Sequence, residues 1–248
     1  SSTVQSVDGE APGALKSSSV VSANLEALPS SHASTWVIAG LGRSFGADRE
    51  QVLALAQKKI DGMRYEDSKY PIVAKHWPDH GAADGDSHEL LPTDHRPISE
   101  VLHYADYVYS HLKPVDMIMP CHVVFSGEGS FDADNMVSLS AFWLHRAREQ
   151  AGKDVIIISD CFSMGAIDKS SLVATMCLAT NPERGRYPEI SHADAMTDIV
   201  LLCNKSIAEL KEVVSNMDHQ PHEVCTKRLQ KWLAWSEDAE KQVCDTIV

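Results

Sequence analysis

The chain has 248 residues, which is enough for one large domain or two small ones. Its 22 basic and 35 acidic residues give a formal net charge of −13 at pH 7. A phosphate backbone would be repelled by this charge, so we expect no nucleic-acid partner. No apolar run approaches the ~18 residues that a membrane helix needs, and we therefore expect no membrane-spanning segment.

The chain divides into an N-terminal arm and one α/β domain. Residues 1–22 are rich in Ser, Gly and Ala without periodicity, which predicts a loose arm. Over residues 23–248, apolar runs alternate with amphipathic segments. A helix is expected at 47–63, because Asp48 is a suitable N-cap and apolar residues recur at helical spacing. Another is expected at about 97–112, since proline suits a first helical turn.

Four apolar runs predict strands, at residues 71–75, 117–120, 155–159 and 199–203. Strands that are apolar throughout and separated by helices indicate a parallel sheet covered on both faces. Polar residues follow each strand: Lys75-His76, Cys121-His122, Ser159-Asp160 and Cys203-Asn204. Barrel enzymes and doubly wound sheets both carry their sites at such strand ends. No Gly-rich phosphate fingerprint follows a strand, which disfavours the nucleotide-binding version.

The six cysteines lie mostly beside or inside apolar runs: Cys121, Cys161, Cys177, Cys203, Cys225 and Cys244. We interpret them as reduced core residues. Reduced cysteines are typical of the reducing compartments of the cell, so we expect a cytoplasmic protein.

Polar residues are densest in the segment 75–88, which begins at the end of the first predicted strand. It holds three histidines and three aspartates: His76, His80, His88, Asp79, Asp84 and Asp86. Three interpretations remain open for this segment: a solvated surface loop, a metal site, or a site for acid/base chemistry and substrate binding. No H-E-x-x-H motif or cysteine pair fixes a metal geometry, and acid/base chemistry is favoured.

Within this loop, Asp86 and His88 stand two residues apart and would project to the same side of an extended chain. A carboxylate beside an imidazole favours the protonated form, which suits a proton donor near neutral pH. The alternative is a loop histidine that simply hydrogen-bonds to Asp86. Asp160 ends an apolar strand, where its carboxylate could attack an electrophilic carbon or, alternatively, cap the next helix.

Four segments together resemble a known family. They are G-R-S-F-G-A-D, A-K-H-W-P-D-H-G-A-A-D-G-D-S-H, D-M-I-M-P-C-H-V and I-I-I-S-D-C-F-S-M-G-A, in this order. From about Trp36 to Asn204 the chain is similar to the bacterial β-N-acetylglucosaminidases of glycoside hydrolase family 3. The resemblance implies a (β/α)8 TIM-barrel-type fold, no cofactor or metal, and hydrolysis of β-linked N-acetylglucosamine, as in saccharides from cell-wall fragments.

The resemblance also implies residue roles. Asp160 matches the aspartate that forms a covalent glycosyl-enzyme, and His88 matches the acid/base, with Asp86 as its partner in a dyad. Arg43, Lys75 and His76 match residues that hold the sugar. The implied reaction is a double displacement with retention of configuration.

Some positions depart from the family pattern. Cys161 stands where a second aspartate is usual, and Asp79 where glycine is usual. The family barrel also begins upstream with strands that bring an acidic residue and an arginine to the sugar, so this chain looks truncated and resembles the barrel from about its fourth strand. We expect either a partner chain to close it, as in an oligomer, or the arm and a helix at 223–246 to cover it. A non-catalytic sugar-binding or interaction relative and a metal-dependent hydrolase remain alternatives.

Overall fold

The protein is described by a computed structural model. It covers residues 20–22, 38, 42–168, 172–181, 187–217, 226–230 and 232–234. Most of the predicted arm, residues 1–19, lies outside these ranges, as does most of the helix predicted at 223–246. Within the described ranges, no helix is both long and apolar enough to span a membrane.

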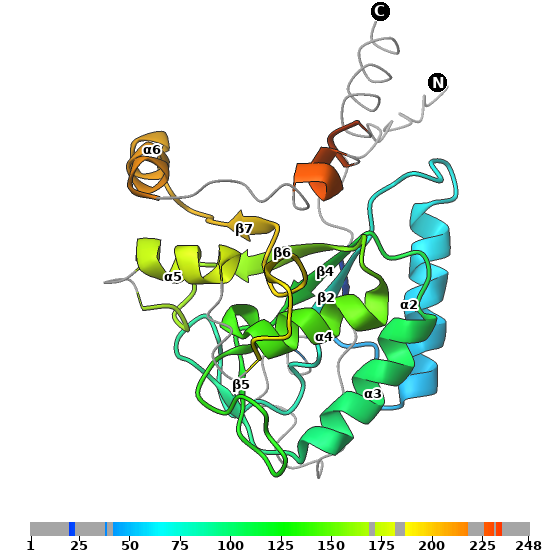
Figure 1. The fold of residues 1–248 in the computed structure, drawn as a ribbon. Coiled ribbons are helices and arrows are strands. Elements are labelled where there is room, and N and C mark those ends of the chain that lie inside the picture. Colours follow the sequence, from blue (N-terminus) through cyan, green and yellow to red (C-terminus); the bar gives the residue numbers. More distant parts are fainter. Residues whose placement is uncertain are drawn as a thin grey trace, which may run out of the picture.

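A parallel sheet of five strands forms the centre of the described residues, in the order β1-β2-β4-β6-β7 (Figure 1). The strands are β1 (Val20–Ser22), β2 (Val73–Trp77), β4 (Met117–Pro120), β6 (Ile156–Cys161) and β7 (Ile199–Leu201). The four strands predicted from the sequence are confirmed in place, in parallel direction and in neighbour order. Their carboxyl ends therefore share one rim.

The strand β1 corrects one expectation. Residues 20–22 were predicted as part of a loose arm, but they pair with β2, with Val20 opposite Val73. A run of three residues is too short to show a period, so the pairing with β2 makes this segment a strand. Among the described strands, β1 and β7 each have a single neighbour, so this part of the sheet is open. It corresponds to part of the circle of eight strands in a (β/α)8 barrel.

Three helices cover the outer face of the sheet: α2 (Arg49–Met63), α3 (Ile98–His111) and α4 (Ala141–Ala151) (Figure 1). The predicted helices correspond to α2 and α3. α2 begins at Asp48, whose carboxylate accepts a hydrogen bond from the Gln51 N–H at 2.8 Å. Its apolar face packs with α3, α4 and the strands into the main core. Leu55, which the helical spacing places on that face, is instead 39% exposed.

Smaller elements complete the rim. β3 (Thr93–Asp94) and β5 (Val124–Phe125) form a short parallel pair between the loops that follow β2 and β4. α5 (Leu172–Thr180) follows β6, and α6 (Ile207–Asn216) follows β7. Two 3-10 turns are η2 (Val137–Leu139) and η4 (His192–Asp194). A second apolar cluster packs under α5.

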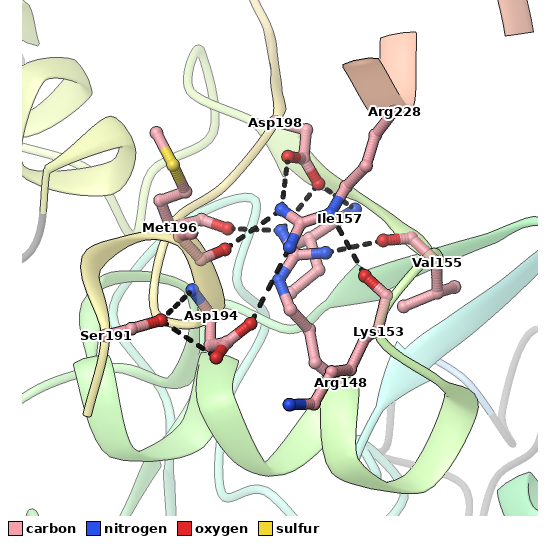
Figure 2. A network of polar contacts seen from close by, with 10 residues as sticks. Arg148, Lys153, Val155, Ile157, Ser191, Asp194, Met196, Asp198 and Arg228 are labelled. Atoms are coloured by element: carbon pink, nitrogen blue, oxygen red, sulfur yellow. Dashed lines mark hydrogen bonds and ion pairs between the residues drawn. The ribbon is translucent and has the colours of Figure 1, made fainter. Parts of the chain in front are cut away.

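A buried ionic network joins α4, β6, β7 and the helical residues 226–230 (Figure 2). Asp198 lies just before β7, and its Oδ2 accepts from Arg148 Nη2 at 2.6 Å and from the Ile157 N–H at 2.8 Å. Its Oδ1 accepts from Arg228 Nη1 at 3.1 Å. The Arg148 side chain is only 1% exposed, so its charge depends on this carboxylate for compensation.

Candidate active site

The side chains of β2 and β6 meet across the end of β4, which lies between them in the sheet. His76 Nε2, from β2, lies 3.5 Å from Asp160 Oδ2 on β6. Lys75 lies near both Asp160 and Arg43. The Asp160 carboxylate raises the pKa of Lys75, whereas the Arg43 guanidinium lowers it. The structure thus gathers Arg43, Lys75, His76 and Asp160 at one rim.

Burial sets the charge state of this group. It is the main reason that the pKa of His76 lies well below its usual value, and His80, Lys75 and Arg43 lower that pKa further. His76 is therefore a neutral imidazole beside the Asp160 carboxylate. Burial also lowers the pKa of Lys75, although Asp160 opposes this effect.

Asp86 and His88 form the expected pair, but within a turn, in which the Glu89 and Leu90 N–H groups donate to the Asp86 carbonyl, and not in an extended chain. His88 Nδ1 lies 2.7 Å from Asp86 Oδ1, and the His88 backbone N–H donates to the same oxygen at 2.8 Å. Burial by itself would raise the pKa of Asp86. The hydrogen bonds from His88 have the larger combined effect, so the pKa of Asp86 lies below its usual value. The His88 side chain is 56% exposed. With Nδ1 on the carboxylate, Nε2 is the nitrogen that can exchange a proton with a bound molecule.

The loop that carries this pair is hydrogen-bonded to the loop that follows Asp160. The Gly165 N–H donates to the His88 carbonyl at 2.9 Å, and the Ala166 N–H donates to the Ser87 carbonyl at 3.0 Å. A Cβ at Gly165 would lie 2.5 Å from the His88 carbonyl oxygen and 2.4 Å from the Glu89 carbonyl carbon. Only glycine permits this approach. The two loops therefore hold the Asp86–His88 pair at the rim of Asp160.

The other two aspartates of the loop serve its structure. Asp79 is buried, accepts from the Gly81 N–H at 2.9 Å, and pairs with Arg96. Arg96 thereby supplies the countercharge for this buried carboxylate. Asp84 Oδ1 accepts from the Thr93 N–H at 2.7 Å. In the described part of the chain, no group of three or more His, Cys, Asp or Glu side chains is arranged to hold a metal ion.

Two buried histidines were missing from the residues assigned to the site. His80 Nε2 lies 3.1 Å from the Ser87 hydroxyl, and the His80 ring lies edge-on to His76. His122 Nδ1 lies 2.7 Å from the Ser138 hydroxyl. Burial lowers the pKa of both imidazoles, and Asp160 opposes this effect in each. A sequence signal existed for both residues: His122 is the second residue after β4, and His80 lies in the polar loop.

A cavity of about 510 Å³ lies at the other end of the sheet, lined by Arg64, Asp116, Asp154, Arg228 and Trp232 among others. Asp116 and Asp154 precede β4 and β6, so this cavity is at the amino ends of the strands. It is therefore separate from the rim that carries Asp160.

The family model described as "Glycosyl hydrolase family 3 N terminal domain" matches residues 30–231. A "Beta-hexosaminidase" of Shewanella frigidimarina is 34% identical over 171 residues, which cover 66% of this chain and 44% of that protein. One of Thioalkalivibrio sulfidiphilus is 28% identical over 209 residues, covering 79% of this chain and 53% of the relative. The chain thus spans about half the length of the curated relatives that it matches.

Solved structures show the same fold. A glycoside hydrolase family 3 β-N-acetylglucosaminidase from Paenibacillus superposes with a TM-score of 0.64 at 21% identity, covering 88% of this chain and 39% of that one. NagZ from Neisseria gonorrhoeae, in complex with N-trifluoroacetyl-D-glucosamine, gives a TM-score of 0.58 at 24% identity, covering 84% and 53%. These similarities support the TIM-barrel-type assignment of the described sheet.

Proposed function

Since the chain belongs to glycosyl hydrolase family 3 through that family's N-terminal domain, we propose that it provides the catalytic rim of a retaining β-N-acetylhexosaminidase. The substrate is a saccharide with a β-linked N-acetylglucosamine. Curated relatives carry the name β-hexosaminidase, and one structural neighbour was solved with an N-acylated glucosamine, which supports this choice of sugar. We further propose a cytoplasmic setting and cell-wall fragments as the source of the saccharide.

Asp160 acts as the nucleophile. Its carboxylate attacks the anomeric carbon and forms a covalent glycosyl ester, while protonated His88 gives its proton to the departing oxygen. Asp86 accepts a hydrogen bond from His88 Nδ1 and stabilises the imidazolium. In the second step, neutral His88 takes a proton from water as that water attacks the anomeric carbon and releases Asp160. Both displacements invert the carbon, so the configuration is retained.

One observation carries this assignment: the hydrogen bonds from Gly165 and Ala166 join the loop of His88 to the loop of Asp160. A nucleophile and a proton donor must flank the same glycosidic bond, and these contacts keep the two groups on one rim. His76 contacts the carboxylate, Lys75 lies near it and Arg43 lies near Lys75, and the three side chains supply N–H donors for the hydroxyl groups of the sugar.

The alternative, a non-catalytic sugar-binding or interaction relative, is favoured by a different observation. The described sheet is open, with β1 and β7 at its edges, and the chain spans about half of its relatives. A partner segment or a second chain would then be needed to complete a pocket. Turnover by the chain itself distinguishes these two functions.

The test compares the unmodified chain with Asp160→Asn on an aryl N-acetyl-β-glucosaminide. We expect Asp160→Asn to abolish turnover with little change in circular dichroism, because an amide cannot form the glycosyl ester and the substitution is nearly isosteric. Asp154→Asn is the matched control, since Asp154 is exposed at the opposite end of the same strand. Full activity in Asp160→Asn would refute the nucleophile. No activity in the unmodified chain, despite binding of N-acetylglucosamine, would favour the alternative.

A further inference from the structure

Two cysteines meet beside Asp160. Cys161 is the last residue of β6, and Cys203 follows the neighbouring strand β7. The Cys161 sulfur accepts hydrogen bonds from the Cys203 N–H at 3.2 Å and from the Ser163 N–H at 3.3 Å. The two thiols also lie close enough for each to shift the pKa of the other. The sequence predicted core cysteines, which holds for buried Cys121, but Cys203 is exposed and Cys161 is partly exposed.

The two thiols differ in reactivity. Partial burial would raise the pKa of Cys161, but the N–H groups of Cys203 and Ser163 outweigh it and lower the pKa below its usual value. The pKa of Cys203 is raised instead, first by the neighbouring Cys161 side chain and then by burial. Asp160 adds to this increase. Cys161 therefore loses its proton more readily than Cys203, and neither residue is fully buried.

We propose that Cys161 and Cys203 form a reversible oxidation site at the rim of the active site, where a peroxide converts the two thiols into a disulfide. The Cys161 thiolate attacks the O–O bond, gains an S–O bond, and releases hydroxide, which is protonated to water. The Cys203 sulfur then attacks this sulfenic sulfur and forms the S–S bond, while the S–O bond breaks and a second water leaves. Two thiols and one hydrogen peroxide therefore give one disulfide and two waters. A dithiol reductant reverses the reaction by exchange.

Oxidation changes the contacts that hold the nucleophile. The Cys161 N–H donates to Asp160 Oδ1 at 2.8 Å, and the Ser163 hydroxyl donates to the Cys203 carbonyl at 2.6 Å. A disulfide sulfur is a poorer acceptor than a thiolate, so the N–H bonds from Ser163 and Cys203 weaken when the bridge forms. The same loop continues to Gly165, which holds the loop of His88. We therefore expect oxidation to disturb both the nucleophile and the acid/base pair.

The chemical test uses the reduced full chain treated with hydrogen peroxide, alkylated to block remaining thiols, and digested for mass spectrometry. We expect a Cys161–Cys203 cross-linked peptide that disappears on treatment with dithiothreitol. Cys203→Ser should stop at the sulfenic acid of Cys161, which dimedone traps. Cys177→Ser is the matched control and should form the bridge as the unmodified chain does, because Cys177 lies in α5. Preferential oxidation of Cys177, or absence of the bridge, would overturn the oxidation site.

The effect on catalysis rests on the proposed function and is measured separately. If the chain hydrolyses an aryl N-acetyl-β-glucosaminide, peroxide should lower kcat/KM at least ~10-fold, dithiothreitol should restore it, and Cys177→Ser should respond alike. A bridge that forms without change in kcat/KM would overturn the coupling to the active site. Because the cross-linked peptide is detected without any substrate, failure of the glycosidase assignment leaves the oxidation site testable.

Discussion

The histidines of the candidate site differ in their surroundings, and this difference supports the separate roles that we propose for them. His76, His80 and His122 are buried, and burial lowers their pKa values, so they are neutral hydrogen-bonding groups. His88 is exposed and bonded through Nδ1 to a carboxylate whose pKa is lowered by that contact. A group that must gain and lose a proton in each cycle needs this second environment.

The His88→Ala substitution should slow the hydrolysis of substrates with poor leaving groups more than that of substrates with good leaving groups. A poor leaving group needs protonation as it departs, and one acid/base residue typically contributes ~10²–10⁴-fold. We expect a loss of that size for a natural disaccharide, and a much smaller loss in the first step for an activated aryl glycoside. Steady-state kinetics on both substrates measure the difference.

The control for this variant is His111→Ala, an exposed histidine at the end of α3, which should leave both rates unchanged. Azide should partly rescue His88→Ala, because it attacks the glycosyl-enzyme without a general base, and the product should be the β-azide. Equal losses on both substrates, or an α-configured product by NMR, would remove His88 from the acid/base role.

Among the elements, the contact between the loops after β2 and β6 bears most directly on the proposed catalysis. Its closeness depends on Gly165, where a side chain would meet the backbone of His88 and Glu89 at 2.4–2.5 Å. Backbone atoms cannot rotate away as a flexible side chain can. A larger residue must therefore separate the loops.

Gly165→Ala should consequently lower kcat while the fold is retained. A displacement of ~1 Å in a reacting group can cost ~10²-fold in rate, which is the loss that we expect. Hydrogen exchange should also accelerate at residues 86–90. Gly62→Ala in α2 is the matched control, because nothing lies within 4 Å of its Cβ position. Unchanged kcat and exchange in Gly165→Ala would mean that the loop contact does not position His88.

The network around Asp198 gives a prediction about stability. Asp198→Asn leaves Arg148 and Arg228 without their shared carboxylate in a buried site, and breaking such a pair costs ~3–5 kcal/mol. Urea denaturation should show a loss of this size in the free energy of unfolding. Asp106→Asn breaks a partly exposed pair with Arg146, also from α4, and should cost only ~0–1 kcal/mol. Similar losses in the two variants would contradict a dominant effect of burial.

The open edges of the described sheet lead to a prediction about self-association of the whole chain. Among the described strands, β1 and β7 each lack a second neighbour, and unpaired edges bind other strands. We expect the purified chain of 27.2 kDa to self-associate as its concentration rises. Size-exclusion chromatography with light scattering measures this mass. A constant monomer mass at every concentration would mean that other residues of the chain cover the edges.

Several features of this protein follow from the sequence alone. Continuous apolar runs followed by polar residues predict buried parallel strands. This holds for β4, which is buried throughout, whereas β7 at the edge of the described sheet is half-buried. Asp48 predicts the start of α2 for a similarly local reason. Asp86 and His88 were expected to pair because they are two residues apart, and they do so, although in a turn and not in an extended chain. Family motifs identified Asp160 and Lys75, and strand pairing brings them to one rim.

Contacts between distant segments were decided only by the tertiary structure. β1 becomes a strand through pairing with β2, and Asp79 is stable in the interior because Arg96 supplies its countercharge. Cys161 and Cys203 meet because β6 and β7 are neighbours. Periodicity reports which face of an element is buried, but it carries no information on which loop lies opposite another. That choice depends on how the strands pair, and here it determines which groups can act together at the rim.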